Sequence, residues 1–185
     1  PSGIAAPRDG EDLRQIVAET AKHNEPILAR GAGSSLAGQT VGSGVVLDFS
    51  RHMHQLLSLD PIRQSAWVQP GLVLDELNRQ ASAHGLLFGP DVSTSTHATL
   101  GGMIANRSAG SYSLKYGMTD EHVIALDCVL ADGTKLRFQK GASRQDPLVE
   151  QLTAEVSKIV WSVENEIDQR FPTTKRNVAG YALDD

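Results

Sequence analysis

Apolar residues recur at helical spacing near the start of the chain, in a stripe formed by Leu13, Ile16, Val17 and Ala21. Asp9 precedes this stripe as a candidate N-cap, so we expect a helix that begins there and ends near Asn24, before Pro26. Short apolar runs at 26–30 and 45–49 predict two buried strands. A helix beside two strands indicates a small α/β lobe, which we expect to end near residue 58.

The middle of the chain alternates between hairpin and helix patterns. Segments 56–59 and 64–69 flank a turn that contains Pro61, which favours a β-hairpin. Residues 72–81 have helical spacing, and Gly85 can end that helix in the left-handed conformation. A second hairpin is predicted from the mostly apolar strand 123–131, the turn Asp132-Gly133 and the return strand 134–138.

The last third of the chain predicts one long amphipathic helix. Asp146 is a candidate cap and Pro147 suits the first helical position, and the helix should run to about Arg170. Its apolar stripe is formed by Leu148, Leu152, Val156, Ile159, Val160, Val163 and Ile167. We interpret this stripe as core packing, with the alternative that it exposes surface meant for a missing part. Because the chain starts at Pro1 without Met, we expect it to be a piece of a longer protein.

Composition and charge narrow the class of protein. The 185 residues are 40% hydrophobic and 21% charged, which is typical of a globular domain. The formal net charge is −5 and no Lys/Arg run occurs, which argues against nucleic-acid binding. No apolar run approaches the ~20 residues needed to cross a bilayer, and no signal pattern begins the chain, so a cytoplasmic location is expected. Cys128 is the one cysteine, so no internal disulfide or multi-cysteine metal site can form.

A first glycine-rich loop spans residues 30–39, with the sequence Arg-Gly-Ala-Gly-Ser-Ser-Leu-Ala-Gly-Gln. Glycines let the backbone turn sharply and bring successive N–H groups together, which suits a diphosphate. The serine hydroxyls add donors, whereas Arg30 is better placed to start the loop than to neutralise phosphate. A flexible surface loop remains the alternative. The spacing matches neither a P-loop nor a Rossmann fingerprint.

A second loop spans residues 89–106 and is rich in hydroxyl side chains but poor in charge. A helix is expected after its Ser/Thr run, with Gly101 and Gly102 in the first turn. Glycines at those positions would let a bulky ligand approach the backbone. Two such loops from two lobes could clamp opposite sides of one extended dinucleotide.

Four motifs carry a family resemblance: the loop at 30–39, Ala-Thr-Leu-Gly-Gly-Met-Ile-Ala-Asn at 98–106, Tyr116-Gly117, and Val-Leu-Ala-Asp-Gly at 129–133. In this order and spacing they resemble the FAD-linked oxidases of the para-cresol methylhydroxylase and vanillyl-alcohol oxidase type. The chain is most similar to the branch that contains D-lactate dehydrogenase, glycolate oxidase and D-2-hydroxyglutarate dehydrogenase. Segment 175–183 also resembles that branch.

The resemblance implies an α+β flavin domain of two lobes. The small α/β lobe 1–58 would be followed by a larger lobe 59–185 with a mixed or antiparallel sheet and flanking helices. FAD would lie between the lobes without a covalent bond, because neither loop has His or Cys at the usual covalent positions. The implied diphosphate ligands are Gly31, Ala32, Gly33, Ser34, Ser35 and Gly38. The implied diphosphate and flavin contacts are Pro90, Asp91, Thr96, Ala98, Thr99, Gly101, Gly102 and Asn106. Tyr116, Gly117 and Val123 would lie toward the ribose and adenine.

The resemblance also implies which parts this chain lacks. In such enzymes a cap domain binds the substrate and supplies the catalytic histidines and any metal ligands, so we expect no catalytic residue or metal ligand in these 185 residues. A full-length parent, which could be peripheral to the inner membrane, would pass hydride from a D-2-hydroxy acid to flavin. The alternatives are a reductase of the same superfamily that acts on a UDP-sugar enolpyruvyl ether, and a flavin-free scaffold. Arg107 and Ala109, where many relatives have Asn and Gly, are the departures that favour a scaffold.

Overall fold

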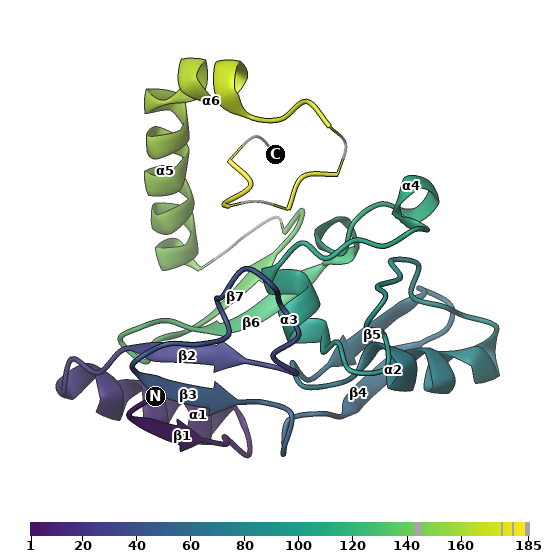
Figure 1. The fold of residues 1–185 in the computed structure, drawn as a ribbon, viewed down its shortest axis with the longest axis horizontal. Helices are drawn as coiled ribbons and strands as arrows, with labels where there is room; N and C mark the ends of the chain where they lie inside the picture. The colour runs from purple at the N-terminus through teal and green to yellow at the C-terminus, as the bar shows by residue number, and fades with distance from the viewer. Residues whose placement is uncertain (143–145, 175, 179, 184–185) are drawn as a thin grey trace.

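A three-stranded parallel sheet with one helix beside it forms the N-terminal part of the computed structural model (Figure 1). The structure describes residues 1–142, 146–174, 176–178 and 180–183. The elements in order are β1 (Gly3–Ala5), α1 (Gly10–Lys22), β2 (Ile27–Arg30) and β3 (Val45–Asp48). Strand β3 lies in the middle and pairs in parallel with both neighbours. The sequence pattern did not predict β1, because it has three residues and its one large apolar side chain, Ile4, is 73% exposed.

Helix α1 begins where the sequence predicted. The Asp9 carboxylate accepts the backbone N–H groups of Glu11 and Asp12, both at 2.8 Å, so the N-cap is confirmed. The helix is partly buried, with Val17 as its most enclosed side chain.

The core of the second lobe lies between two helices. Strands β4 (Leu56–Asp60) and β5 (Ser65–Val68) form the first predicted hairpin, and α2 (Leu74–Ala81) follows. A 3-10 turn, η1 (Ser82–His84), leads to Gly85, whose φ of +69° ends the helical path as expected. Helix α3 (Leu100–Ala105) packs against α2. The shared core cluster consists of Leu72, Leu74, Leu77, Ala98, Leu100 and Met103.

The second predicted hairpin is confirmed as β6 (Ala125–Val129) and β7 (Lys135–Gln139), which pair antiparallel. Short helices α4 (Ser113–Tyr116) and η2 (Asp120–His122) precede it. Among the described residues, the two hairpins form separate two-stranded sheets. The guanidinium carbon of Arg137 on β7 lies 4.9 Å from the centroid of the Trp67 ring on β5, so a cation–π contact joins the hairpins.

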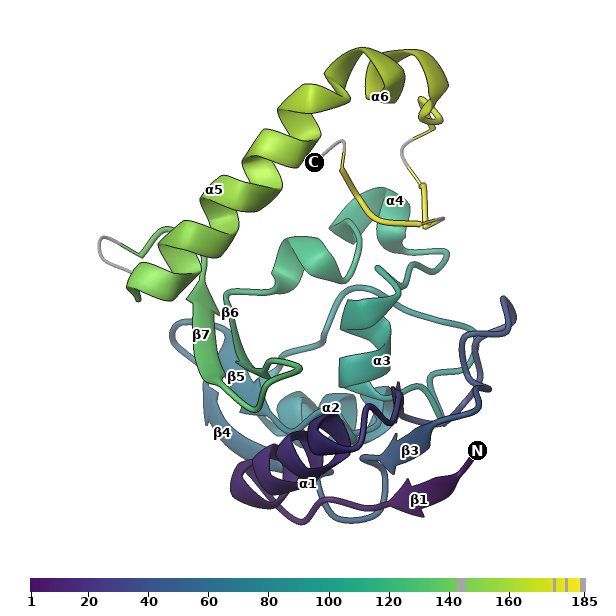
Figure 2. The same ribbon diagram turned by 90° about the vertical axis from the view of Figure 1, so that its left-hand side faces the viewer.

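The long C-terminal helix is the element that departs most from expectation. The Asp146 cap is confirmed, since its carboxylate accepts the Leu148 N–H at 2.8 Å. The helix is not continuous, however: α5 (Pro147–Ser162) and α6 (Glu164–Arg170) are separated at Val163. The interpretation of the whole stripe as core was wrong. Val149 is 1% exposed, but Val156 is 54% exposed, because α5 rises away from the hairpins and only its lower end contacts β7 (Figure 2).

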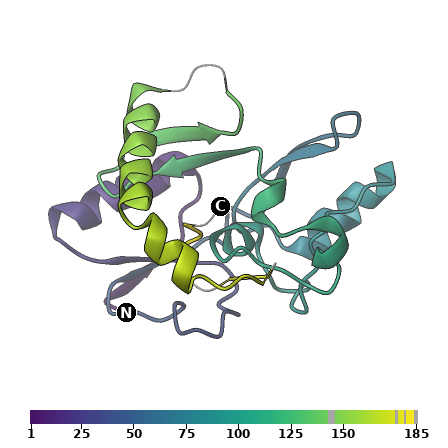
Figure 3. The same cartoon turned by 90° about the horizontal axis from the view of Figure 1, so that it is seen from above.

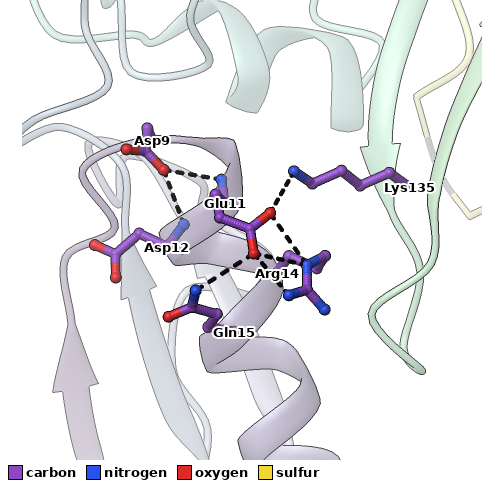
Figure 4. Close-up of polar contacts among 6 residues, drawn as sticks. All are labelled: Asp9, Glu11, Asp12, Arg14, Gln15 and Lys135. Atoms are coloured by element: carbon purple, nitrogen blue, oxygen red, sulfur yellow. Dashed lines mark hydrogen bonds and ion pairs between the residues drawn. The ribbon is translucent and has the colours of Figure 1, made fainter.

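The second hairpin contacts the N-terminal part of the chain along α1. The β6–β7 hairpin passes over α1 in the view from above (Figure 3). At this contact the Lys135 ammonium lies 2.8 Å from a Glu11 carboxylate oxygen, and Arg14 and Gln15 donate to the same carboxylate (Figure 4). Hydrogen bonds first from Arg14 and then from Lys135 lower the Glu11 pKa to about 2. Hairpin and helix therefore meet through an exposed polar cluster.

Candidate cofactor-binding site

Residues 31–44, which contain most of the first glycine loop, connect β2 to β3. Because these strands are parallel, the chain must return along the length of the sheet, a task that a helix usually performs. Between β2 and β3, a glycine-rich segment without a helix makes this connection. It leaves from the carboxyl end of β2, the edge of a parallel sheet at which ligands generally bind.

The first loop offers backbone donors that the fold does not use. Among the residues that the structure describes, the N–H groups of residues 32–38 donate no hydrogen bond within the chain. Gly33 has φ +71° and Gly38 has φ +84°, a conformation that disfavours residues with a Cβ. The Arg30 side chain lies against Gly33, where an added Cβ would be 2.9 Å from Nε. Loops of this kind, with successive free N–H groups, can bind an anion.

Hydrogen bonds of Asp91 with the residues that follow α3 hold the second loop in place. The Asp91 carboxylate accepts the Tyr112 backbone N–H at 2.7 Å and the Ser111 hydroxyl at 2.9 Å. The Tyr112 N–H is the main cause of a lowered Asp91 pKa. Gly110 fits against this residue so closely that an added Cβ would lie 1.3 Å from the Asp91 carbonyl oxygen. Pro90, beside Asp91, is almost completely buried.

At the start of α3, where the sequence predicted that a bulky ligand could approach the backbone, two N–H groups are already bonded within the chain. The Leu100 N–H donates to the Leu72 carbonyl and the Gly101 N–H to the Pro70 carbonyl, both at 2.8 Å. An added Cβ at Gly101 would lie 2.7 Å from the Pro70 Cβ, so this glycine permits close packing of two segments. The first-turn glycine was predicted correctly, but these two N–H groups serve the fold.

The two loops meet at two points. Gly31 lies against Thr99, and a Cβ at Gly31 would be 1.9 Å from the Thr99 Oγ1. Farther along, the Gln39 side-chain amide donates to the Asn106 Oδ1 at 2.8 Å. The Asn106 amide in turn donates to the Gly102 carbonyl at 3.0 Å. The structure thus brings together four of the predicted site residues: Gly31, Thr99, Gly102 and Asn106.

Other predicted residues have their recorded contacts within the second lobe. Thr96 Oγ1 lies 2.6 Å from Nδ1 of His97, a hydrogen bond between neighbours. Ala98 is buried in the core, and the Tyr116 side chain packs on Gly89. Gly117 has φ +83° at the end of α4. Val123 lines a cavity of about 360 Å³ whose other lining residues are Ile104, Asp120, Ile124, Ala125, Leu126, Phe138, Gln139, Lys140 and Thr153.

Sequence reasoning missed several residues that shape this site. Gln39 stood in the first motif but was not named as a contact, because its partner Asn106 is 67 residues away. Gly110 is one of four glycines between positions 101 and 117, and this clustering could have marked it as a place of close backbone approach. The pair Arg107 and Asp120, joined at 2.8 Å, had no signal in the sequence beyond opposite charge.

A family model described as an FAD binding domain matches residues 1–139. The chain belongs to this family of FAD-binding domains. It is 33% identical to D-2-hydroxyglutarate dehydrogenase of Pseudomonas putida, over 99% of this chain and 19% of that protein. It is 38% identical to glycolate oxidase subunit GlcD of Bacillus subtilis, over 74% of this chain and 29% of that protein. The resemblance drawn from the motifs is therefore confirmed.

Solved structures agree with this fold. The chain superposes on an alkyldihydroxyacetonephosphate synthase with a TM-score of 0.69 and 28% identity, over 76% of this chain and 27% of that one. This confirms the α+β FAD-binding fold. The chain spans between 19% and 29% of the length of these three proteins. The family model ends before α5, so both C-terminal helices lie outside the matched domain.

Membrane-spanning and metal-binding features are absent from the described parts of the chain. There, no helix combines the length and the hydropathy needed to span a bilayer. Within the same residues, no three His, Cys, Asp or Glu side chains come close enough to hold a metal ion. The Cys128 thiol lies half-buried on β6, and burial raises its pKa.

Proposed function

We propose that this FAD-binding domain holds its FAD without a covalent bond where the two glycine loops meet. The diphosphate would lie on the first loop, at Gly31, Ala32, Gly33, Ser34, Ser35 and Gly38. The second loop would contribute contacts from Pro90, Asp91, Thr96, Ala98, Thr99, Gly101, Gly102 and Asn106. Tyr116, Gly117 and Val123 would lie toward the adenosine. The boundary between the two lobes would lie near residue 58.

The single observation that carries the proposal is the contact between Gly31 and Thr99 beside a row of unused backbone N–H groups. A chain with net charge −5 binds a diphosphate more readily through amide dipoles than through long-range attraction, because its overall field repels anions. The residues present fit the group: the first loop supplies donors, and Asn106 approaches the same place from the other lobe.

We propose further that a longer protein of this kind oxidises a D-2-hydroxy acid. The support is the similarity to a D-2-hydroxyglutarate dehydrogenase and to a glycolate oxidase subunit. When bound, the flavin would supply the hydride acceptor, and the protein would supply orientation and electrostatics. The residues of the two loops would bind and orient the cofactor, and the substrate contacts would come from a cap domain outside residues 1–185.

The test compares two glycines of the segment that connects β2 to β3. Gly31→Ala places a methyl group 1.9 Å from the Thr99 hydroxyl, whereas Gly42→Ala meets only the Leu28 side chain at an ordinary 3.8 Å. FAD affinity is measured by the change of flavin fluorescence during titration with each purified chain. We expect Gly31→Ala to bind FAD at least about tenfold more weakly than wild type, a loss of ~1.4 kcal/mol. Gly42→Ala should bind as wild type does.

Two results would count against the site. If the wild-type chain leaves flavin fluorescence unchanged at every concentration, the proposed cofactor binding is wrong. If wild type binds FAD and both alanine variants bind equally well, FAD binds this domain somewhere other than the meeting of the loops.

A further inference from the structure

Helix α3 ends in a left-handed turn at Arg107, a conformation that arginine rarely adopts. The Ser108 N–H donates to the Met103 carbonyl at 2.9 Å, and the Arg107 N–H to the Ile104 carbonyl at 3.1 Å. This pair of bonds defines a Schellman motif, in which the residue after the C-cap adopts the left-handed conformation. That residue is Arg107, with φ +46°. Glycine or asparagine usually occupies this position, because a Cβ is unfavourable there.

An ion pair holds the Arg107 side chain. Its Nε lies 2.8 Å from the Asp120 Oδ2, and the two side chains are only 19% and 30% exposed. The second carboxylate oxygen, Oδ1, is buried and has no hydrogen-bond partner among the residues that the structure describes. This carboxylate is partly removed from water and pairs with a guanidinium. The pair therefore contributes more to stability than a surface ion pair does.

The same turn is fixed from a second direction. Thr119, which is completely buried, donates its hydroxyl to the Ser108 carbonyl at 2.7 Å. Asp120 and Thr119 therefore bind the two residues that follow Asn106, which are Arg107 and Ser108. The C-cap itself is Asn106, whose side chain meets Gln39 of the other lobe.

We propose that Arg107 and Asp120 are positioning residues for FAD. Their ion pair holds a left-handed backbone turn that an arginine would otherwise resist, and this turn presents Asn106 to the first loop. The inference rests on the proposed FAD site, and it assigns to Arg107 a structural use of its charge. A cation beside a dinucleotide site would ordinarily suggest a diphosphate ligand, but in this turn the guanidinium Nε is committed to Asp120.

A double-mutant cycle separates these roles. The chains are wild type, Asp120→Asn, Arg107→Gly and the double variant, with FAD affinity and thermal midpoint measured for each. Asp120→Asn keeps the shape and removes the charge, so we expect FAD affinity to fall about five- to tenfold and the midpoint to drop. In Arg107→Gly, the glycine adopts φ +46° without an ion pair to hold it. This variant should therefore bind FAD within about twofold of wild type. Adding Asp120→Asn to Arg107→Gly should then leave FAD affinity unchanged. The thermal midpoint should rise, because this second substitution removes a partly buried carboxylate that Arg107→Gly leaves unpaired.

The matched control is Glu76→Gln, which removes an exposed arginine–carboxylate pair, with Arg79 at 2.6 Å, and should leave FAD affinity unchanged. All affinities are measured at a temperature at which circular dichroism shows every variant folded, so that a general loss of stability cannot mimic the effect.

Each other outcome overturns a stated part. If Arg107→Gly loses FAD affinity as strongly as Asp120→Asn or more, the arginine side chain contacts the cofactor directly. If Asp120→Asn weakens FAD binding equally in both backgrounds, Asp120 does not act through Arg107. If wild type binds no FAD, the proposed function fails and the positioning role with it. The thermal midpoints then show separately whether the ion pair holds the turn.

Discussion

The two glycine loops differ in how they use their polar groups. The first loop leaves its N–H groups at 32–38 unused and exposes its one large apolar side chain in that stretch, Leu36, completely. The second loop commits its amides and its carboxylate to the fold, with Gly110 pressed against Asp91 and the α3 amides bonded to Pro70 and Leu72. The first loop therefore has N–H groups available to a partner from outside the chain. The second loop is fixed by contacts within the chain and forms a rigid wall beside the first loop.

This difference predicts that changes in the second loop will lower stability, whereas changes in the first loop will lower cofactor affinity. The largest effect should come from Gly110→Ala, at a glycine that follows the second loop and packs against its Asp91. Its methyl group would lie 1.3 Å from a backbone oxygen, so the chain must move there. We expect the free energy of unfolding, measured by urea denaturation, to fall by about 3 kcal/mol.

The control for this variant is Gly10→Ala at the start of α1, where an added Cβ has no neighbour within 4 Å. It should change the free energy of unfolding little or raise it, because alanine favours helix. Equal effects of the two substitutions would mean that the second loop is not a rigid wall.

A smaller effect is expected from Thr119→Val, which removes a buried hydroxyl while keeping its shape. The Ser108 carbonyl would keep only the Thr119 backbone N–H at 3.2 Å as a donor from that residue. The free energy of unfolding should fall by about 1 kcal/mol. Thr153→Val on α5 is the matched control, because the Thr153 hydroxyl donates to a carbonyl of its own helix, that of Val149, and joins no second segment. A loss no larger than the control's would show that Thr119 does not secure the turn after α3.

In the first loop, Gly38→Ala should separate affinity from stability. Gly38 has φ +84° and open space around it, so alanine is strained only in its backbone. We expect FAD affinity to fall about fivefold, equivalent to ~1 kcal/mol, because the strained loop presents its amides less often in the required geometry. The thermal midpoint without FAD should change less than in Thr119→Val. The opposite ranking would reverse the roles of the two loops.

The sequence predicted local elements well because their signals are local. The Asp9 cap, the Pro61 turn and the Gly85 end of α2 each depend on residues within a few positions, and all three are present. The motif resemblance then identified the family. Neither signal could show that Gly31 rests on Thr99, since only the assembled fold brings positions 68 residues apart together.

The failures have the same physical origin. The stripe of α5 has helical periodicity, but periodicity does not say whether a second surface covers the apolar face, and Ile159 is 60% exposed. Likewise, Gly101 and Gly102 predicted a close approach of a ligand to the backbone at the start of α3. The N–H groups of Leu100 and Gly101 instead bond to carbonyls of a segment about 30 residues earlier. Arg107 was named only as a departure from the family pattern, since the Asp120 that pairs with it lies 13 residues away.

The weakest expected effect concerns Asp91, which ties the second loop together by charge. Its pKa is lowered from 3.8 mainly by the Tyr112 N–H. A carboxyl group with a lowered folded pKa contributes stability that is fully present above its unfolded pKa and is lost as pH falls through the folded pKa. The thermal midpoint of wild type should therefore exceed that of Asp91→Asn at about pH 6, and the difference should shrink below about pH 4. The effect should be small because Asp91 remains solvated. A difference that stayed constant from about pH 6 to about pH 3 would show that the shape of the side chain, and not its charge, holds the wall.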